Sequence, residues 1–268
     1  MLWVSSPPML PTRQDERANP PRGGDAKPTS LWEVVGLPKV STAWYVTFMA
    51  VCCTCLLFSN AGSASADGVS FSDEFAGLDP ARWSKGDHML GRSYLDPANV
   101  DVDGENLRIK LPARTLNGGE IYTNDLSGYG SYSARMKLPN APSSITGFFL
   151  YRAPDHESEI DIEVFNDTTR RVLFTTYAGG SQTHTETVKL PFDPTSGFHE
   201  YRFDYSQDSV AFLVDDVEMR SWDTGVPQTS MHLMVNSWFP RWLEGKRPKK
   251  TVFTYVDRIS YEAQQPAG

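Results

Sequence analysis

Apolar and polar residues alternate with a period of two along most of the chain from Val69 onward, and no window of a dozen residues shows a helical stripe. Such alternation predicts β-strands with one buried side and one solvent-facing side. The clearest stretches are residues 106–111, 131–138, 184–190, 200–205, 209–214 and 252–261. This part of the chain is therefore predicted to be all-β.

Turn signals separate the predicted strands. They contain the glycine, proline, asparagine and aspartate residues that tight turns favour. They are Asp103-Gly104, Asn117-Gly118-Gly119, Pro139-Asn140-Ala141-Pro142, Gly179-Gly180, Asp193-Pro194 and Asp215-Asp216. Many short strands joined in this way indicate a sandwich or barrel of antiparallel sheets, in which the outer face of a curved sheet can form a groove.

The first third of the chain has a different composition. Residues 1–38 are rich in proline and lack an apolar period, so we expect a disordered extension, or a start codon assigned too early with Val34 or Val35 as alternatives. Residues 39–66 combine Lys39, an apolar run over 40–58 and the A-x-A motif of residues 64–66, which predicts a cleaved secretory signal. The alternative is that the uncleaved 40–58 segment anchors the protein in a membrane.

Charge and cysteine content narrow the range of functions for the predicted mature domain, residues 67–268. Its roughly 200 residues can bury one full core, so we expect a single domain. All three cysteines lie in the apolar run, at Cys52, Cys53 and Cys55, which leaves the domain without disulfides, zinc thiolates or a cysteine nucleophile. The full chain has a net charge of −8, and this charge together with the lack of a basic stripe excludes nucleic acid as an expected partner.

The residues that indicate chemistry are Glu159-Ile160-Asp161-Ile162-Glu163. In a β-strand the three acids point to one face and the two isoleucines to the other. Crowding three like charges favours one carboxyl that keeps its proton beside one that is ionised, and hydrolysis of sugars needs that combination. The hypothesis is a glycosidase, and the alternative is an ordinary solvated sheet face.

This acid strand resembles the active-site motif of glycoside hydrolase family 16, in the form without a β-bulge residue that is typical of licheninases. The resemblance covers nearly the whole predicted mature chain, and the further segments that carry it are 71–75, 119–124, 128–132, 198–204 and 212–216. It implies a β-jelly-roll sandwich of two curved antiparallel sheets with a substrate cleft on the concave face. It also implies that Glu159 is the nucleophile, that Glu163 is the acid/base and that Asp161 assists the nucleophile.

Candidate substrate-binding residues are those that stack on sugars or bond their hydroxyl groups. Phe149, Tyr151 and Tyr177 flank the acid strand. The resemblance adds Glu120, Asn236 and Trp238 as cleft residues, whereas Trp242 follows in a loop with many lysines and arginines. Tyr122 stands where licheninases have an arginine. The expected substrate-binding set is therefore Glu120, Tyr122, Phe149, Tyr151, Tyr177, Asn236, Trp238 and Trp242.

No cofactor is expected for catalysis. The resemblance places Asp257 at a position that binds a structural calcium ion near the Asp103-Gly104 turn. A lone aspartate in an edge strand is otherwise an ordinary surface residue.

The sequence thus predicts a secreted, monomeric, retaining endo-β-glucanase that acts on β-1,3/1,4-linked polysaccharide, with no stable membrane contact once the signal is cleaved. Two alternatives stay open. One is a transglycosylase on the same substrates, and the other is a non-catalytic β-glucan-binding protein with the same fold.

Overall fold

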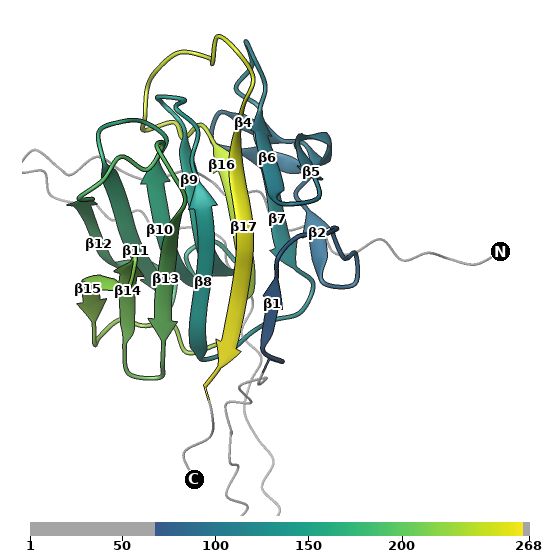
Figure 1. The fold of residues 1–268 in the computed structure, drawn as a ribbon. Coiled ribbons are helices and arrows are strands. Elements are labelled where there is room, and N and C mark those ends of the chain that lie inside the picture. The colour runs from purple at the N-terminus through teal and green to yellow at the C-terminus, as the bar shows by residue number, and fades with distance from the viewer. Residues whose placement is uncertain (1–67, 265–268) are drawn as a thin grey trace, which may run out of the picture. The chain divides into compact units, whose positions relative to one another are not determined.

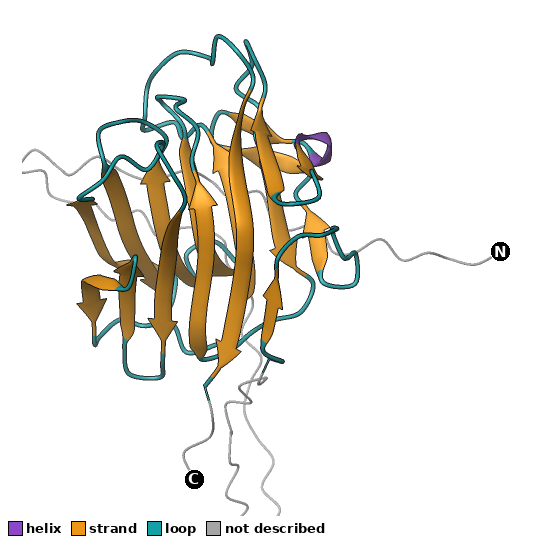
Figure 2. Ribbon diagram, viewed as in Figure 1, coloured by secondary structure: helices purple, strands orange, loops and turns teal. Residues whose placement is uncertain are grey.

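The computed structural model of the chain describes residues 68–264, and the expectations for residues 1–38 and 39–66 fall outside them. The described residues form two stacked antiparallel sheets and one two-stranded hairpin (Figure 1). Apart from one short 3-10 turn, η1 (Pro97–Asn99), the regular structure in this range is β (Figure 2). No helix within it has the length and apolar character needed to cross a bilayer. The all-β prediction is confirmed.

Sheet A has eight strands. Its order is β15 (Val217–Trp222), β14 (Val210–Val214), β13 (His199–Tyr205), β8 (Gly130–Lys137), β17 (Val252–Ala263), β6 (Leu107–Leu111) and β5 (Val100–Val102), with β1 (Phe71–Asp73) paired to β17.

Sheet B has seven strands and carries the acid motif near its middle. Its order is β12 (Ser181–Lys189), β11 (Arg171–Ala178), β10 (Ser158–Phe165), β9 (Ile145–Arg152), β16 (His232–Trp238), β7 (Gly119–Thr123) and β2 (Trp83–Lys85). The hairpin of β3 (His88–Leu90) and β4 (Ser93–Leu95) forms the third, smallest sheet. All six stretches with the clearest alternation are strands, with boundaries close to those predicted.

Two of the predicted turns show why their residues are needed. Gly179 and Gly180 link β11 to β12 with φ of 59° and 78°, and Asp215 and Asp216 link β14 to β15 with φ of 48° and 64°. Two successive residues with positive φ form the hairpin turn whose twist matches that of the flanking strands, and glycine and aspartate tolerate this conformation.

The main core lies between the two sheets. Aromatic rings form its centre: Phe148 of sheet B lies 5.1 Å from Phe203 of sheet A, and Phe174 stacks on Phe212 at 4.8 Å between ring centroids. The strands supply these rings from alternate positions, so the other positions of each strand face away from the core. Sheet B therefore has a second face, and this face carries the acids.

Candidate active site

The acid motif occupies β10, between β9 and β11. Ile160, Ile162 and Val164 are fully buried in the core between the sheets. Because side chains alternate along a strand, Glu159, Asp161 and Glu163 lie on the opposite face of sheet B. Backbone pairing to both neighbouring strands fixes this register, so the three carboxylates share one face as the sequence predicts.

Neighbours in register with the acids carry no positive charge. Glu159 lies between Tyr151 of β9 and Tyr177 of β11, and Asp161 lies between Phe149 and Thr175. Glu163 lies between Gly147 and Leu173. A solvated acidic face is normally relieved by lysine or arginine on adjacent strands. The surroundings here are aromatic and small residues instead, which favours the ligand-binding interpretation over the solvated face.

A second apolar cluster lies on the same face as the acids. It consists of Phe149, Tyr151 and Met234, with the partly buried Tyr122 packed against them. These residues belong to β9, β16 and β7, so the cluster begins on the strand next to β10 and extends across sheet B. Sheets of this kind usually bury apolar residues on one face only. Aromatic rings on the second face, next to the acids, are suited to stacking against sugar rings.

The turn between β9 and β10 flanks the Glu159 end of the site. The Tyr151 hydroxyl donates to Asp155 at 2.7 Å, and the His156 ring stacks on Tyr177 at 4.8 Å between centroids. These contacts hold two of the predicted sugar-binding tyrosines on either side of Glu159. His156 contributes an aromatic ring beside Tyr177 at this end of the site.

The Glu163 end of the site is built from small and polar residues. Gly147 is the register partner of both Glu163 and Asn236, and Asn236 is in turn the partner of Glu120. Glu120 is 1% exposed, and its two carboxylate oxygens accept hydrogen bonds from His88 (2.9 Å) and Asn236 (3.0 Å). Glu120 and Asn236 therefore lie together in one row with Glu163.

Trp238 and Trp242 lie in a smaller apolar cluster beside the hairpin β3–β4. Trp238 is fully buried among Leu90, Leu95, Ile145 and Phe165, and Trp242 packs against Phe165 with ring centroids 5.8 Å apart. Both tryptophans therefore stabilise this end of sheet B. Contact of either ring with substrate stays a prediction.

Arg92 holds the loop that carries Trp242 through several hydrogen bonds. Arg92 donates to the carbonyl oxygens of Pro240 (3.0 Å), Leu243 (2.6 Å) and Gly245 (3.3 Å). The lysines and arginines that follow in this loop are exposed, which agrees with a solvated charge run; they are Lys246, Arg247, Lys249 and Lys250.

The structure does not support the calcium site expected at Asp257. Its carboxylate pairs with Arg135 of the neighbouring strand, and a cation would have to displace that guanidinium. Asp103, from the turn expected nearby, accepts hydrogen bonds from the backbone N–H groups of Glu105 and Asn106. Within residues 68–264, no group of three or more histidine, cysteine or acidic side chains is arranged to hold a metal ion.

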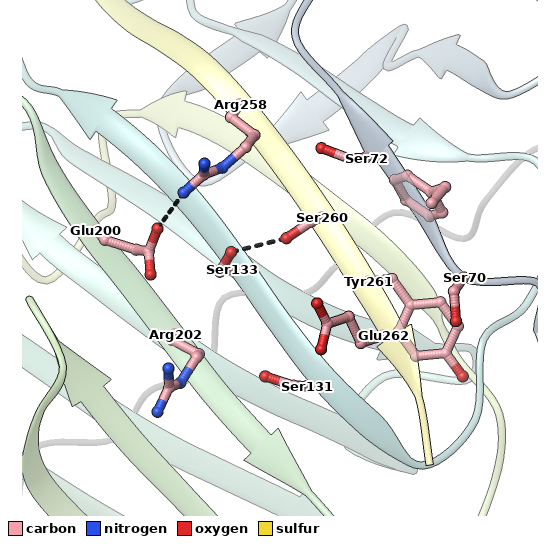
Figure 3. A pocket seen from close by; sticks show the side chains of 11 residues that line it. Ser70, Ser72, Ser131, Ser133, Glu200, Arg202, Arg258, Ser260, Tyr261 and Glu262 are labelled. Atoms are coloured by element: carbon pink, nitrogen blue, oxygen red, sulfur yellow. Dashed lines mark hydrogen bonds and ion pairs between the residues drawn. The ribbon is translucent and has the colours of Figure 1, made fainter. Parts of the chain in front are cut away.

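A hollow of about 560 Å³ lies on the outer face of sheet A (Figure 3). Four of its polar side chains form two pairs: Arg258 donates to Glu200, and Ser133 and Ser260 share a hydrogen bond of 2.9 Å. A surface with its charges paired in this way is typical of a solvated sheet face. The candidate active site is therefore the acid-bearing face of sheet B.

The sequence comparison decides the family. The model of glycosyl hydrolases family 16 matches residues 92–252, which run from β4 to the first residue of β17 and include the acid motif. The chain belongs to glycosyl hydrolase family 16. The resemblance seen in the sequence is confirmed, and this family 16 chain is a glycoside hydrolase.

Individual relatives agree in sequence and in structure. The family 16 chain is 29% identical over 222 residues to the beta-glucanase of Bacillus subtilis (strain 168), an alignment that covers 76% of this chain and 91% of the relative. Its fold is similar to that of the Bacillus licheniformis beta-glucanase, with a TM-score of 0.68 at 26% identity over 74% of this chain and 99% of the other. A prokaryotic beta-1,3-1,4-glucanase (lichenase) from a mouse hindgut metagenome gives 0.67 at 26% identity, covering 74% of this chain and all of that one.

Several residues beside the site were not predicted from the sequence. His88, His156 and Met234 reach it from other strands or turns, and no local motif distinguishes them from ordinary surface or core residues. Gly147 had a usable signal, since a glycine inside an apolar strand indicates a close approach. An added Cβ there would lie 2.8 Å from the Asn236 Oδ1 atom.

Proposed function

We propose that this family 16 chain is a secreted retaining endo-β-glucanase in which Glu159, Asp161 and Glu163 are the catalytic residues. Glu159 attacks the anomeric carbon while Glu163 donates a proton to the oxygen of the departing sugar, which forms a glycosyl ester on Glu159. Glu163, now ionised, takes a proton from water as the water displaces Glu159 from the sugar. Asp161, between them on the same face, assists Glu159.

The observation that carries this proposal is the shared face of β10. Three carboxylates lie there in the order long, short, long, and the adjoining strands provide aromatic rings and the small Gly147. The shorter aspartate leaves room for a sugar ring between two glutamates, and the aromatic cluster offers a surface for neighbouring sugar units. A non-catalytic binding protein needs the aromatic surface but gains nothing from three crowded like charges.

The proposed substrate class is β-1,3/1,4-linked glucan. It is supported by the beta-glucanase relatives from Bacillus and by the similarity to a solved lichenase. The polar end of the row, formed by Asn236 and Glu120, suits the hydroxyl groups of an unsubstituted glucan chain.

A panel of polysaccharides tests the substrate class. We expect reducing ends to appear from lichenan and barley β-glucan about ten times faster than from laminarin or xyloglucan. The first product released should have the β-configuration at its new reducing end, because double displacement inverts the anomeric carbon twice. Proton NMR of the early reaction mixture measures this configuration directly.

The same panel separates the alternatives. Transfer products longer than the starting oligosaccharide, formed without release of reducing ends, would identify a transglycosylase. Binding to lichenan without any turnover would identify a glucan-binding protein. Early products with the α-configuration would contradict the retaining mechanism.

Secretion is proposed from the apolar run over residues 40–58 and the A-x-A motif that follows it. We expect the exported protein to begin near Asp67, and N-terminal sequencing of protein from the culture medium measures this. Full-length protein in the membrane fraction would instead favour the uncleaved anchor.

A further inference from the structure

The imidazole ring of His88 faces a hydrogen-bond acceptor on each side. Its Nε2 atom lies 2.9 Å from Glu120 Oε1, and its Nδ1 atom lies 3.2 Å from the carbonyl oxygen of Met89. A carboxylate and a carbonyl can only accept hydrogen bonds, and a neutral imidazole has a single N–H group. Both contacts are therefore satisfied together only when His88 is a cation.

Glu120 transmits this contact to Asn236. Its second oxygen, Oε2, accepts a hydrogen bond of 3.0 Å from Asn236 Nδ2. Because the carboxylate cannot donate, the amide must turn its NH2 group toward Glu120 and its carbonyl oxygen the other way. That oxygen, Oδ1, lies over Gly147, where an added Cβ would be 2.8 Å away. Gly147 is the register partner of Glu163, so Oδ1 points toward the strand of the acids.

This amide oxygen is an available acceptor. Asn236 is fully buried, and within the described part of the chain its Oδ1 atom has no hydrogen-bond partner. A buried acceptor of this kind costs free energy unless a ligand supplies a donor. A hydroxyl group of a bound sugar is such a donor.

The His88–Glu120 ion pair is largely buried. The His88 side chain is 17% exposed and that of Glu120 is 2% exposed. The backbone at Gly86 packs directly against Glu120, since a Cβ there would lie 2.7 Å from Oε1, and the Gly86 N–H donates to the Glu120 carbonyl oxygen at 2.9 Å. Little water reaches the pair, so its electrostatic attraction is screened less than that of a surface pair.

We propose that His88 is a positioning residue of the substrate cleft, which as a cation holds Glu120 and, through it, orients the Asn236 amide oxygen as a fixed acceptor for a sugar hydroxyl beside Glu163. This inference rests on the proposed function. His88 itself does not touch the reacting atoms, and its expected effect is on substrate binding rather than on the chemical step.

Because His88 acts as a cation, substrate binding is expected to depend on pH. Burial lowers the pKa of His88, but the hydrogen bond and charge of Glu120, with smaller contributions from the Met89 carbonyl and Asp87, outweigh burial and raise it above its ordinary value. The charged groups facing the ring are Glu120 of β7 and Asp87, and Asp87 also accepts a hydrogen bond from Tyr94 of β4. The cation is present below this raised pKa and is lost as the pH rises through it.

The test compares kcat and KM on lichenan from pH 5 to 9 for the full-length protein and two variants. For the unaltered protein we expect KM to rise about five- to tenfold as His88 loses its proton, with little change in kcat attributable to His88. His88→Gln keeps one neutral donor and should show a KM without this rise. His88→Ala removes the donor and should show the high KM at every pH.

His199→Gln is the matched control. His199 also pairs with a carboxylate, Asp215 at 2.7 Å, but it belongs to β13 of sheet A. It should keep the pH profile of the unaltered protein. An identical KM profile for the unaltered protein and His88→Gln would overturn the inference, as would losses in His88→Ala confined to kcat.

An NMR titration of the His88 ring separates this inference from the proposed function. We expect its pKa to lie above the ordinary value in the unaltered protein and to fall in Glu120→Gln, whether or not the protein hydrolyses glucan. A protein inactive on every polysaccharide with a raised His88 pKa would contradict the proposed function alone. An active protein with an ordinary His88 pKa would contradict this inference alone.

Discussion

Replacing Glu159 by glutamine is expected to abolish hydrolysis of lichenan, with a loss of about 10⁴-fold or more in kcat. Glutamine has nearly the same size and keeps one acceptor oxygen, but it carries no negative charge and cannot form the glycosyl ester. Backbone pairing to β9 and β11 holds the position on both sides, so the substitution should leave the fold intact. Reducing-end assays together with thermal unfolding measure both effects.

Glu157→Gln is the matched control for Glu159→Gln. Glu157 is exposed and lies two residues before Glu159, in the turn that precedes β10, so its substitution removes the same charge outside the shared face. It should retain nearly full activity. Substantial turnover by Glu159→Gln, or equal losses in the two variants, would reject Glu159 as the nucleophile.

Replacing Glu163 by alanine is expected to reduce kcat on lichenan by about 10²- to 10⁴-fold. The loss should be much smaller for the first step on an aryl glycoside with a good leaving group, because that group departs without a proton. The glycosyl ester should then accumulate, and added azide should release it as a β-glycosyl azide. In Glu159→Ala, azide should instead attack the substrate directly and give the α-azide.

Azide products from the two alanine variants thus distinguish the roles of the two glutamates. Equal losses on lichenan and on the aryl glycoside in Glu163→Ala would contradict its role as the acid. An α-azide from Glu163→Ala and a β-azide from Glu159→Ala would instead identify Glu163 as the nucleophile and Glu159 as the acid/base. Glu157→Ala, with no azide product expected, is the control.

The fold was predictable from the sequence because its signal is local. A strand such as β6 alternates cleanly, since Leu107, Ile109 and Leu111 are all fully buried on one side of the strand. The turns at Gly179-Gly180 and Asp215-Asp216 need residues that accept positive φ, and the sequence shows them. Which strands are neighbours was not predictable in this way, because β16 lies between β9 and β7 although it is far from both in the chain.

The candidate site was predictable only where its residues lie close together in the sequence. The three acids share a face because they belong to one strand with a period of two. The contacts of His88 depend on where the β3–β4 hairpin packs. No pattern in residues 88–95 predicts that His88 pairs with Glu120. Trp238 illustrates the opposite case, since the motif around it indicates the cleft while the fold buries the ring in a cluster beside the hairpin.

Asp257 shows the limit of transferring a metal ligand from a resemblance. The position matches the family, but a ligand site is a property of several residues in space. In this chain Arg135 lies opposite Asp257 and neutralises it, which the sequence near Asp257 could not reveal.

Trapping the covalent intermediate tests the central claim most directly. In a 2-deoxy-2-fluoro glucan oligosaccharide the fluorine slows both formation and hydrolysis of the glycosyl ester. An activated leaving group speeds formation alone, so the ester accumulates on the enzyme. Digestion and mass spectrometry should then find one glycosyl unit, attached to the peptide that contains Glu159 and to that residue within it. A label on Glu163 or Glu120, or full turnover of the reagent with no labelled peptide, would contradict the account.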